Sequence, residues 1–137
     1  QVIKDYGELP LIECYPRQMN QVFMNIISNA IDAINESLVN GLFSLDNPPK
    51  IAIKTQSLDQ NQIQLVVWNN GPEIPEENMG RIFDPFFTTK PVGKGTGLGL
   101  SICYQIVANH SGNLSVTSAP GQGCEFLITL PISAANI

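Results

Sequence analysis

Positive charge, cysteine and long hydrophobic runs are all scarce in this sequence, and each shortage excludes a class of protein. Seven Lys and Arg residues oppose twelve Asp and Glu, and the formal net charge of −5 argues against binding to nucleic acid or to an acidic membrane surface. No apolar run approaches the roughly 20 residues that cross a bilayer, and no signal peptide opens the chain. We therefore expect a cytoplasmic domain, and the sequence leaves open whether its parent protein is soluble or membrane-anchored.

The three cysteines, Cys14, Cys103 and Cys124, are odd in number and lack CxxC spacing, which excludes a disulfide framework and a typical zinc site. We expect reduced thiols in the core of a cytosolic protein. The 137 residues, of which 43% are hydrophobic and 14% charged, suit one globular domain with a single core. Because Gln1 already lies in a strand-like pattern, we expect residues 1–137 to be a single domain cut from a longer protein.

Hydrophobic periodicity predicts two long helices among short strands. Alternating patterns predict strands at residues 2–6, 11–15, 51–57, 63–68, 114–118 and 125–130, and a short helix is expected at residues 76–82. Apolar residues recur at helical spacing over residues 16–39 and 98–109. In the second of these helices the residues expected to face the core are Leu98, Ile102, Ile106 and Val107.

A glycine-rich stretch precedes the second long helix and is the first candidate site. Gly93, Gly95, Gly97 and Gly99 alternate within the run GKGTGLGLSI. Glycine lets the backbone approach a ligand closely, and the unpaired N–H groups of a helix N-terminus attract anions. The stretch therefore suits phosphate binding, although a flexible loop that starts a helix explains it equally well.

The first long helix carries a polar stripe. Asn25, Asn29 and Asp32 stand at positions i, i+4 and i+7, away from the apolar face. The two amides suit a site that needs neutral oxygen ligands, and an ordinary solvated helix face is the plain alternative. Two further segments stand out between the helices: residues 69–75 (NNGPEIP), a strong turn signal, and residues 83–90 (FDPFFTTK), whose phenylalanines are expected to clamp a mobile loop to the body of the domain.

In this order the motifs resemble the catalytic and ATP-binding domain of sensor histidine kinases, which belongs to a superfamily shared with DNA gyrase, heat-shock chaperone ATPases and mismatch-repair ATPases. Residues 25–30 (NIISNA) resemble the N box, residues 69–75 the first glycine box and residues 83–90 the F box, and residues 95–100 (GTGLGL) match the second glycine box. The resemblance implies a two-layer α/β sandwich, in which a mixed five-stranded sheet packs against about three helices and a mobile ATP lid covers the nucleotide.

The resemblance also implies that the domain binds ATP with Mg²⁺ and transfers the γ-phosphoryl group to a histidine. By the match to the N box, Asn29 would hold Mg²⁺ through its side-chain oxygen and Asn25 would lie beside the phosphates, which makes these two the catalytic pair. Further nucleotide contacts are expected from Asp32, Asn69, Gly71, Ile74, Phe86, Thr89, Lys90, Lys94, Gly95, Thr96, Gly97, Leu98, Gly99 and Leu100.

The phosphoacceptor is not evident in this sequence. The only histidine, His110, lies near the end of the second long helix, where the resembling family has a structural histidine. The resemblance implies a substrate histidine in an upstream helical hairpin, a homodimeric parent protein, a monomeric isolated domain and a downstream response regulator receiver domain as partner. The alternatives are a degenerate nucleotide-sensing module without catalysis, another ATPase of the superfamily, or a serine kinase.

The first glycine box departs from the family pattern D-x-G-x-G at two positions. Asn69 replaces the aspartate that accepts a hydrogen bond from the adenine amino group, and Glu73 replaces the second glycine, which would change the turn if that position needs a positive φ. A neutral hydrogen bond contributes roughly 0.5–1.5 kcal/mol against about 1.5–3 kcal/mol for a charged one. We therefore expect adenine binding about tenfold weaker than in close relatives. Because an amide can also donate, we expect a weaker rejection of guanine.

Overall fold

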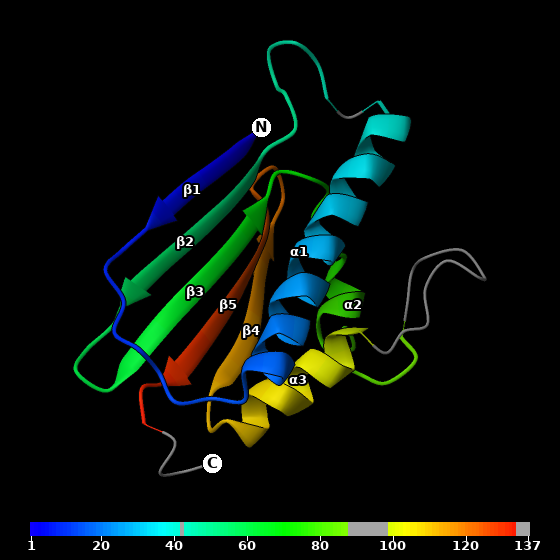
Figure 1. The fold of residues 1–137 in the computed structure, drawn as a ribbon. Helices are drawn as coiled ribbons and strands as arrows, with labels where there is room; N and C mark the ends of the chain where they lie inside the picture. Colours follow the sequence, from blue (N-terminus) through cyan, green and yellow to red (C-terminus); the bar gives the residue numbers. More distant parts are fainter. Residues whose placement is uncertain (42, 88–98, 134–137) are drawn as a thin grey trace.

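Helices cover one face of a five-stranded sheet in the computed structural model, which describes residues 1–41, 43–87 and 99–133 (Figure 1). Among these residues the strands lie in the order β1-β2-β3-β5-β4. β1 runs parallel to β2, and every other neighbouring pair is antiparallel. The predicted two-layer α/β sandwich with a mixed sheet is therefore confirmed. In chain order the elements are β1 (Val2–Tyr6), α1 (Pro16–Val39), β2 (Ile51–Ser57), β3 (Gln62–Asn69), α2 (Glu76–Met79), α3 (Gly99–Asn109), β4 (Asn113–Ala119) and β5 (Gly123–Pro131).

α1 spans the residues that the sequence predicts. Pro16 suits the first helical turn, because its fixed φ is helical and an N–H group there would have no partner within the helix. The helix stops at Asn40, and Gly41 then adopts a positive φ of 75°. No helix of the described part is both long and apolar enough to cross a membrane. The buried residues of α1 recur every three or four positions, namely Met19, Val22, Ile26, Ala30, Ile34 and Ser37.

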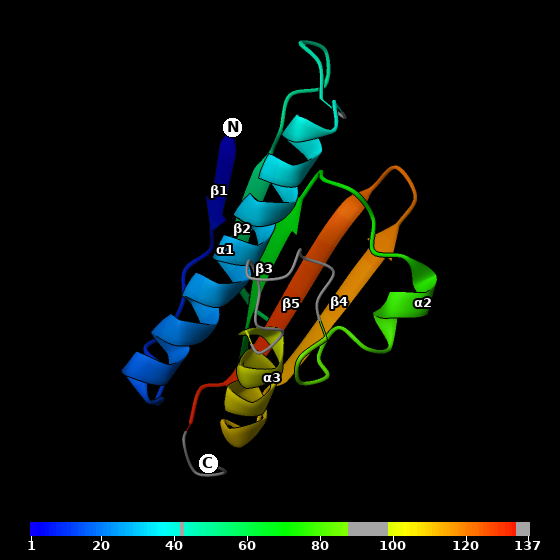
Figure 2. The same cartoon turned by 90° about the vertical axis from the view of Figure 1, so that its right-hand side faces the viewer.

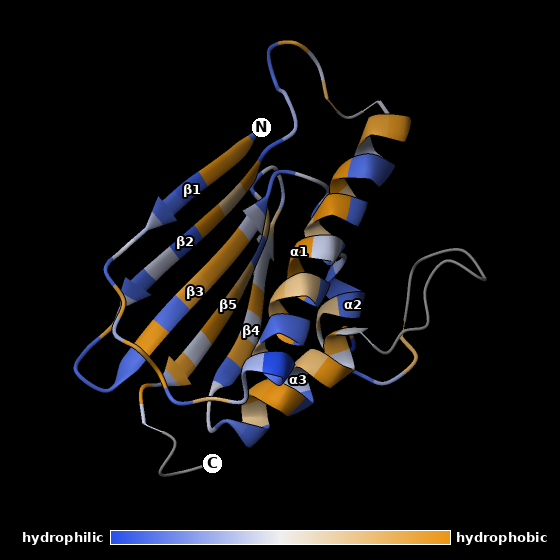
Figure 3. Ribbon diagram, in the orientation of Figure 1, coloured by the Kyte–Doolittle hydropathy of each residue, from blue (hydrophilic) through white to orange (hydrophobic). Residues whose placement is uncertain are grey.

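β3 and β5 supply most of the sheet side of the core. Successive residues of a strand point to opposite faces, so Val67 and its cross-strand partner Phe126 both point toward the helices. Phe126 is only 1% exposed, and burial of such a side chain contributes about 1.5–3 kcal/mol. Hydrophobic residues accordingly recur along β3 and β5 (Figure 3). α1 and α3 pack side by side over this face, so the core lies between them and the sheet (Figure 2).

Two predicted elements differ in the structure. Residues 11–15 alternate in exposure as a strand would, but they form no strand. Their backbone bonds go to scattered partners, since Glu13 N–H donates to the Ile132 carbonyl (2.9 Å) and Tyr15 N–H donates to His110 Nε2 (3.1 Å). The short helix α2 ends at Met79, three residues earlier than predicted, because the chain continues in separate turns.

The inward face of α3 is also rotated from the prediction. Cys103 is fully buried, whereas Ile102 is 36% exposed, so the expectation that Ile102 faces the core is wrong. The buried stripe runs through Cys103, Ile106 and Val107, which stand three and four positions apart on one side of the helix. Leu98, the other residue expected to face inward, lies outside the described residues.

The turn between β4 and β5 contains two glycines in the left-handed region. Gly121 has a φ of 76° and Gly123 a φ of 75°. A Cβ atom at position 121 would meet nothing within 4 Å, but at position 123 it would overlap the backbone oxygen of Asn69 and lie 3.0 Å from the Cα atom of Asn70. Glycine at position 123 therefore lets the end of β3 pass directly against this turn.

These two glycines form a matched pair for a stability test. We expect Gly123→Ala to lower the free energy of unfolding by roughly 2–4 kcal/mol, because left-handed strain and a backbone clash add together. Gly121→Ala introduces the strain alone, so its loss should be about 1–2 kcal/mol. Urea denaturation followed by far-UV circular dichroism measures both values. Equal losses would show that the approach of Asn69 imposes no requirement at position 123.

Candidate functional site

The polar stripe of α1 lies at the edge of the buried face of the helix. Asn25, Asn29 and Asp32 are half-buried, while Ile26 and Ala30 between them are fully buried. The asparagine amides are therefore held close to the body of the domain rather than on an outer, fully solvated face. This position favours the interpretation as a site over the plain alternative of a solvated helix face.

Asn25 also contacts the neighbouring helix α3. Its side chain forms a hydrogen bond with the thiol of Cys103, and Cys103 Sγ donates to the Val22 carbonyl oxygen at 3.8 Å. Burial raises the pKa of the Cys103 thiol, and the hydrogen bond from Asn25 opposes that rise. The sequence analysis missed the role of Cys103, because the contact depends on the packing of two helices that are distant in sequence.

The first glycine turn lies against α1. Asn69, at the end of β3, is only 1% exposed, and its Oδ1 accepts a hydrogen bond from Gly71 N–H at 2.9 Å. A Cβ atom at position 71 would lie 3.5 Å from the carbonyl oxygen of Ala33. Ala33 follows Asn29 by four residues, which is one helical turn. The structure thus brings the predicted turn next to the predicted asparagine stripe.

Hydrogen bonds to the β4–β5 hairpin hold the rest of this turn. Ile74 N–H donates to Ser118 Oγ at 2.8 Å, and Ser118 Oγ donates to the Gly123 carbonyl at 3.3 Å. Glu73 has no positive φ, since Phe86 and Ser111 are the non-glycine residues with positive φ among those described. The altered residue at position 73 therefore does not force an unusual backbone.

Asn70 fixes the other side of the turn and was missed by the sequence analysis. Its Oδ1 accepts from Lys50 N–H at 2.7 Å, and its Nδ2 donates to the Pro48 carbonyl at 2.9 Å. Asn70 N–H also donates to the Lys50 carbonyl at 3.2 Å. Because these partners lie about 20 residues away in the loop before β2, no local sequence pattern points to them.

The phenylalanines of the F-box segment differ in their surroundings. The Phe83 ring lies 5.2 Å from that of Tyr104 and 6.5 Å from that of Phe126, between ring centroids. Phe87 packs on the core, with the Arg81 guanidinium 4.8 Å from its ring centroid. Phe83 and Phe87 therefore anchor the F-box segment to the body of the domain, and the loop of the expected clamp lies outside the described residues.

Phe86 does not take part in this clamp. It is 73% exposed and has a φ of 66°, a strained value for a residue with a side chain. Its predicted role as a nucleotide contact would need a ligand on that exposed side.

The described part of the second glycine box consists of the start of α3. Gly99 is its first residue and is exposed, and Leu100 is partly buried against the core. The first turn of a helix leaves backbone N–H groups without intrahelical partners, and these suit an anion. The remaining predicted contacts lie outside the described residues, namely Thr89, Lys90, Lys94, Gly95, Thr96, Gly97 and Leu98.

His110 is buried, and both ring nitrogens have partners. Nε2 accepts from Tyr15 N–H at 3.1 Å, so the ring proton lies on Nδ1, which donates to the Ile106 carbonyl at 2.8 Å. The Tyr15 ring packs edge-on against the imidazole, 5.5 Å away between centroids. This environment agrees with the structural role expected for His110.

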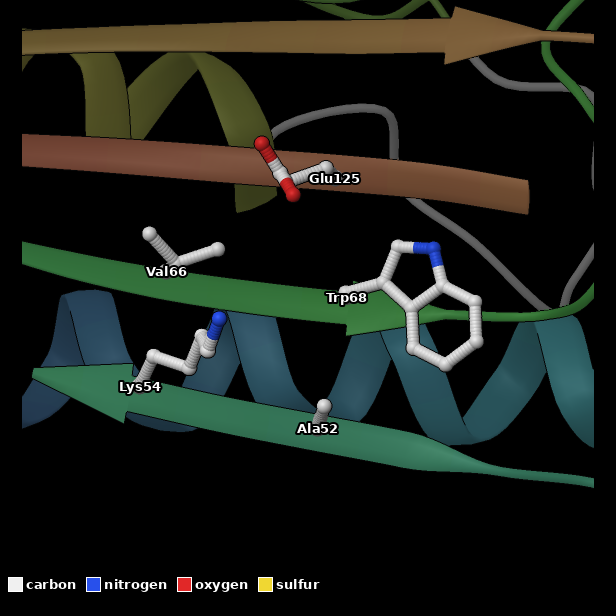
Figure 4. Close-up of a pocket in the computed structure, with 5 residues that line it drawn as sticks. All are labelled: Ala52, Lys54, Val66, Trp68 and Glu125. Atoms are coloured by element: carbon white, nitrogen blue, oxygen red, sulfur yellow. The ribbon is translucent and has the colours of Figure 1, made fainter. Parts of the chain in front are cut away.

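The opposite face of the sheet carries a separate hollow. Trp68 neighbours Asn69 in β3 and points to the other face, where its Nε1 donates to the Gln122 carbonyl at 2.9 Å. The hollow has a volume of about 250 Å³ and is lined by Ala52, Lys54, Val66, Trp68 and Glu125 (Figure 4).

Among the described residues no group of three His, Cys, Asp or Glu could hold a metal ion.

Comparison of the sequence with known protein families identifies the family of this chain. A family described as histidine kinase-, DNA gyrase B- and HSP90-like ATPases matches residues 14–134. The chain belongs to this family. The segments around Asn25, Asn69 and Gly99 all lie within the part of the chain that matches this family.

Individual relatives of this family are sensor kinases. Sporulation kinase E of Bacillus subtilis is 35% identical over 125 residues, which cover 91% of this chain and 15% of the kinase. Signal transduction histidine-protein kinase AtoS of Escherichia coli is 36% identical over 127 residues, which cover 93% of this chain and 19% of AtoS. The chain thus spans less than a fifth of the length of these two relatives.

Solved structures confirm the fold. The catalytic domain of histidine kinase ThkA, in a nucleotide-free form, is 32% identical, with a TM-score of 0.78 over 99% of this chain and 81% of that one. ThkA in complex with the response regulator TrrA is 29% identical, with a TM-score of 0.74 over 99% of this chain and 35% of that one. The fold of this chain is therefore that of histidine kinase catalytic domains.

Burial of Cys124 generates a pH prediction. The side chain is 4% exposed, and burial, followed by the nearby Glu125 carboxylate, raises the pKa of its thiol to about 11. The unfolded chain loses this proton near pH 9, so the folded state binds more protons between about pH 9 and 11. The contribution of Cys124 to the free energy of unfolding therefore has its full value below pH 9 and decreases as the pH rises toward 11.

The test compares the wild type with Cys124→Ala in urea titrations at several pH values. The difference in unfolding free energy between the two proteins should shrink by about 1–3 kcal/mol from pH 8.5 to 11. Subtraction of the variant removes the titration of lysines and tyrosines that both proteins share. A difference that stays constant across this range would contradict the prediction.

Proposed function

We propose that this domain binds ATP together with Mg²⁺ and transfers the γ-phosphoryl group to a histidine outside residues 1–137. The observation that carries the proposal is the meeting of distant segments: the Asn69–Gly71 turn contacts α1 one helical turn beyond Asn29, and Asn25 bonds to α3. Membership in the ATPase family and the sensor kinases among its relatives support the same function.

In this proposal α1 supplies the metal side of the site. Asn29 holds Mg²⁺ through its amide oxygen, and Asn25 lies beside the phosphates, with its amide oriented by the bond to Cys103. Mg²⁺ favours oxygen ligands and keeps several waters, so one protein ligand together with phosphate oxygens suffices. When bound, the ion neutralises charge that develops on the transferred phosphoryl group. Asp32, one turn along the stripe, completes the polar wall.

The two glycine boxes bind opposite ends of the nucleotide. We assign the purine to Asn69, Gly71 and Ile74, which the β4–β5 hairpin holds in place. We assign the phosphates to backbone N–H groups at the start of α3. The proposed phosphate contacts are Lys90, Lys94, Gly95, Gly97 and Gly99, and the proposed further contacts are Phe86, Thr89, Thr96, Leu98 and Leu100.

Phosphoryl transfer to histidine depends on positioning and on charge neutralisation more than on covalent participation of the protein. A neutral imidazole nitrogen attacks the γ-phosphorus, a P–N bond forms, and the bond to the β–γ bridging oxygen breaks as ADP leaves. His110 cannot supply that nitrogen in the folded domain, because Tyr15 and Ile106 occupy both of its ring nitrogens. The acceptor histidine therefore lies outside residues 1–137.

The partners follow from the same proposal. We infer an upstream helical hairpin that carries the acceptor histidine and makes the parent protein a homodimer, while the isolated domain is monomeric and resides in the cytoplasm. The complex of ThkA with the response regulator TrrA supports a receiver domain as the downstream partner. A second candidate function, nucleotide sensing without catalysis, is favoured only by Asn69 in the first glycine box.

The metal role of Asn29 gives a binding prediction. We expect Asn29→Ala to lower the affinity for ATP in the presence of Mg²⁺ roughly tenfold or more, because a ligand bond worth about 1.5 kcal/mol is lost. Asn35→Ala on the exposed side of α1 is the matched control and should leave the affinity unchanged. Isothermal titration with and without Mg²⁺ measures both. Equal affinities of the two variants would remove Asn29 from the metal site.

The phosphotransfer itself is tested in trans. This chain is mixed with the histidine-containing helical domain of its parent and ATP labelled at the γ-phosphate, and acid-labile label should appear on that helical domain. Without it, the chain should bind nucleotide and remain unlabelled. Nucleotide binding with no transfer would favour the sensing module, and label on His110 would contradict the proposed division of roles.

A further inference from the structure

We propose that Asn69 presents a hydrogen-bond donor, its Nδ2 amino group, to the purine base, so that this site accepts a 6-oxopurine nucleotide at least as well as ATP. The proposal rests on the proposed function and specifies the base that the same site selects. Three observations carry it: the place of Asn69 in the fold, the partner of its oxygen, and the surroundings of its nitrogen.

Asn69 lies where a base in the proposed site would meet it. It ends β3 on the sheet face that points to the helices, as Val67 does two residues earlier. The turn that follows touches α1 at the Ala33 carbonyl, one helical turn from Asn29. The Asn69 side chain is therefore placed between the sheet and the helix that carries the proposed metal ligand.

The oxygen of Asn69 already has a partner. Gly71 N–H lies 2.9 Å from Oδ1, and a backbone N–H can only donate. The amide must therefore turn its oxygen, not its nitrogen, toward Gly71. A Cβ atom at position 71 would lie 2.8 Å from this oxygen, so glycine at that position is what lets Oδ1 sit there. The hydrogen bond fixes the orientation of the amide, and glycine at position 71 leaves the space for it.

The amide nitrogen of Asn69 is the group that remains to contact a ligand. Within the described residues Nδ2 donates no hydrogen bond, and no fully buried side-chain nitrogen or oxygen among them lacks a partner. Nδ2 therefore shares in the 1% exposure of Asn69 and is not completely sealed in the interior. A ligand that enters beside α1 meets an N–H donor at this position.

The consequence for the base follows from its 6-position. Adenine carries an amino group there, which donates, whereas guanine and hypoxanthine carry an oxygen, which accepts. An aspartate at position 69 has two acceptor oxygens and can serve both Gly71 and an adenine amino group. An asparagine has one oxygen, which already accepts from Gly71 N–H. Its Nδ2 donor would then face the amino group of adenine, which is also a donor, whereas it can donate to the oxygen of a 6-oxopurine.

The test measures the dissociation constants of ATP, inosine triphosphate and GTP for this chain in Mg²⁺ by isothermal titration. We expect inosine triphosphate to bind at least as tightly as ATP. In Asn69→Asp, which keeps an oxygen for Gly71, the ratio should reverse to at least about tenfold in favour of ATP. Asn35→Asp adds the same charge on the exposed side of α1 and should leave the wild-type ratio unchanged.

Tighter binding of ATP than of inosine triphosphate by more than about threefold in the wild type would overturn the proposal, because the second lone pair of Oδ1 would then serve the adenine amino group. That result would leave ATP binding, and hence the proposed function, intact. Failure of all three nucleotides to bind would overturn the proposed function and this inference together. The wild-type ratio decides the matter even if Asn69→Asp does not fold.

Discussion

The packing of α1 on β3 and β5 sets the position of the proposed site. Burial of Val22, Ile26 and Ala30 fixes the rotation of the helix, because a change of one residue would turn it by about 100°. In that rotation Asn25 and Asn29 lie beside the buried stripe of α1, and Asn25 contacts Cys103 of α3. The polar side chains are thus placed by the apolar ones, and half-burial limits their freedom before any ligand arrives.

The end of β3 depends on the same core. Because side chains alternate along a strand, the register that buries Val67 against Phe126 also turns Asn69 toward the helices. Only glycine at position 123 lets the backbone of Asn69 pass the hairpin turn, and Ser118 then bonds to Ile74 beyond it. Strand register and one glycine therefore place the first glycine turn against α1.

The sequence predicted those features that repeat or that match a family motif. The bounds of α1, the sheet strands apart from residues 11–15, and the order of the boxes follow from periodicity and resemblance. It could not predict the bond of Asn25 to Cys103 or the two bonds of Asn70, since these join segments that only the tertiary packing brings together. The exposure of Phe86 likewise depends on a strained backbone angle that no composition encodes.

The bonds of each polar side chain separate structural residues from candidates for function. Both ring nitrogens of His110 form hydrogen bonds within the fold, and so do both Oδ1 and Nδ2 of Asn70. Asn69 differs, because its oxygen accepts from Gly71 N–H, while its nitrogen donates no hydrogen bond within the described residues and keeps a trace of solvent exposure. A residue with one end fixed by the fold presents the other at a defined angle, which is the condition for selecting a ligand. Asparagine meets this condition with two unlike ends, whereas aspartate offers two like ones.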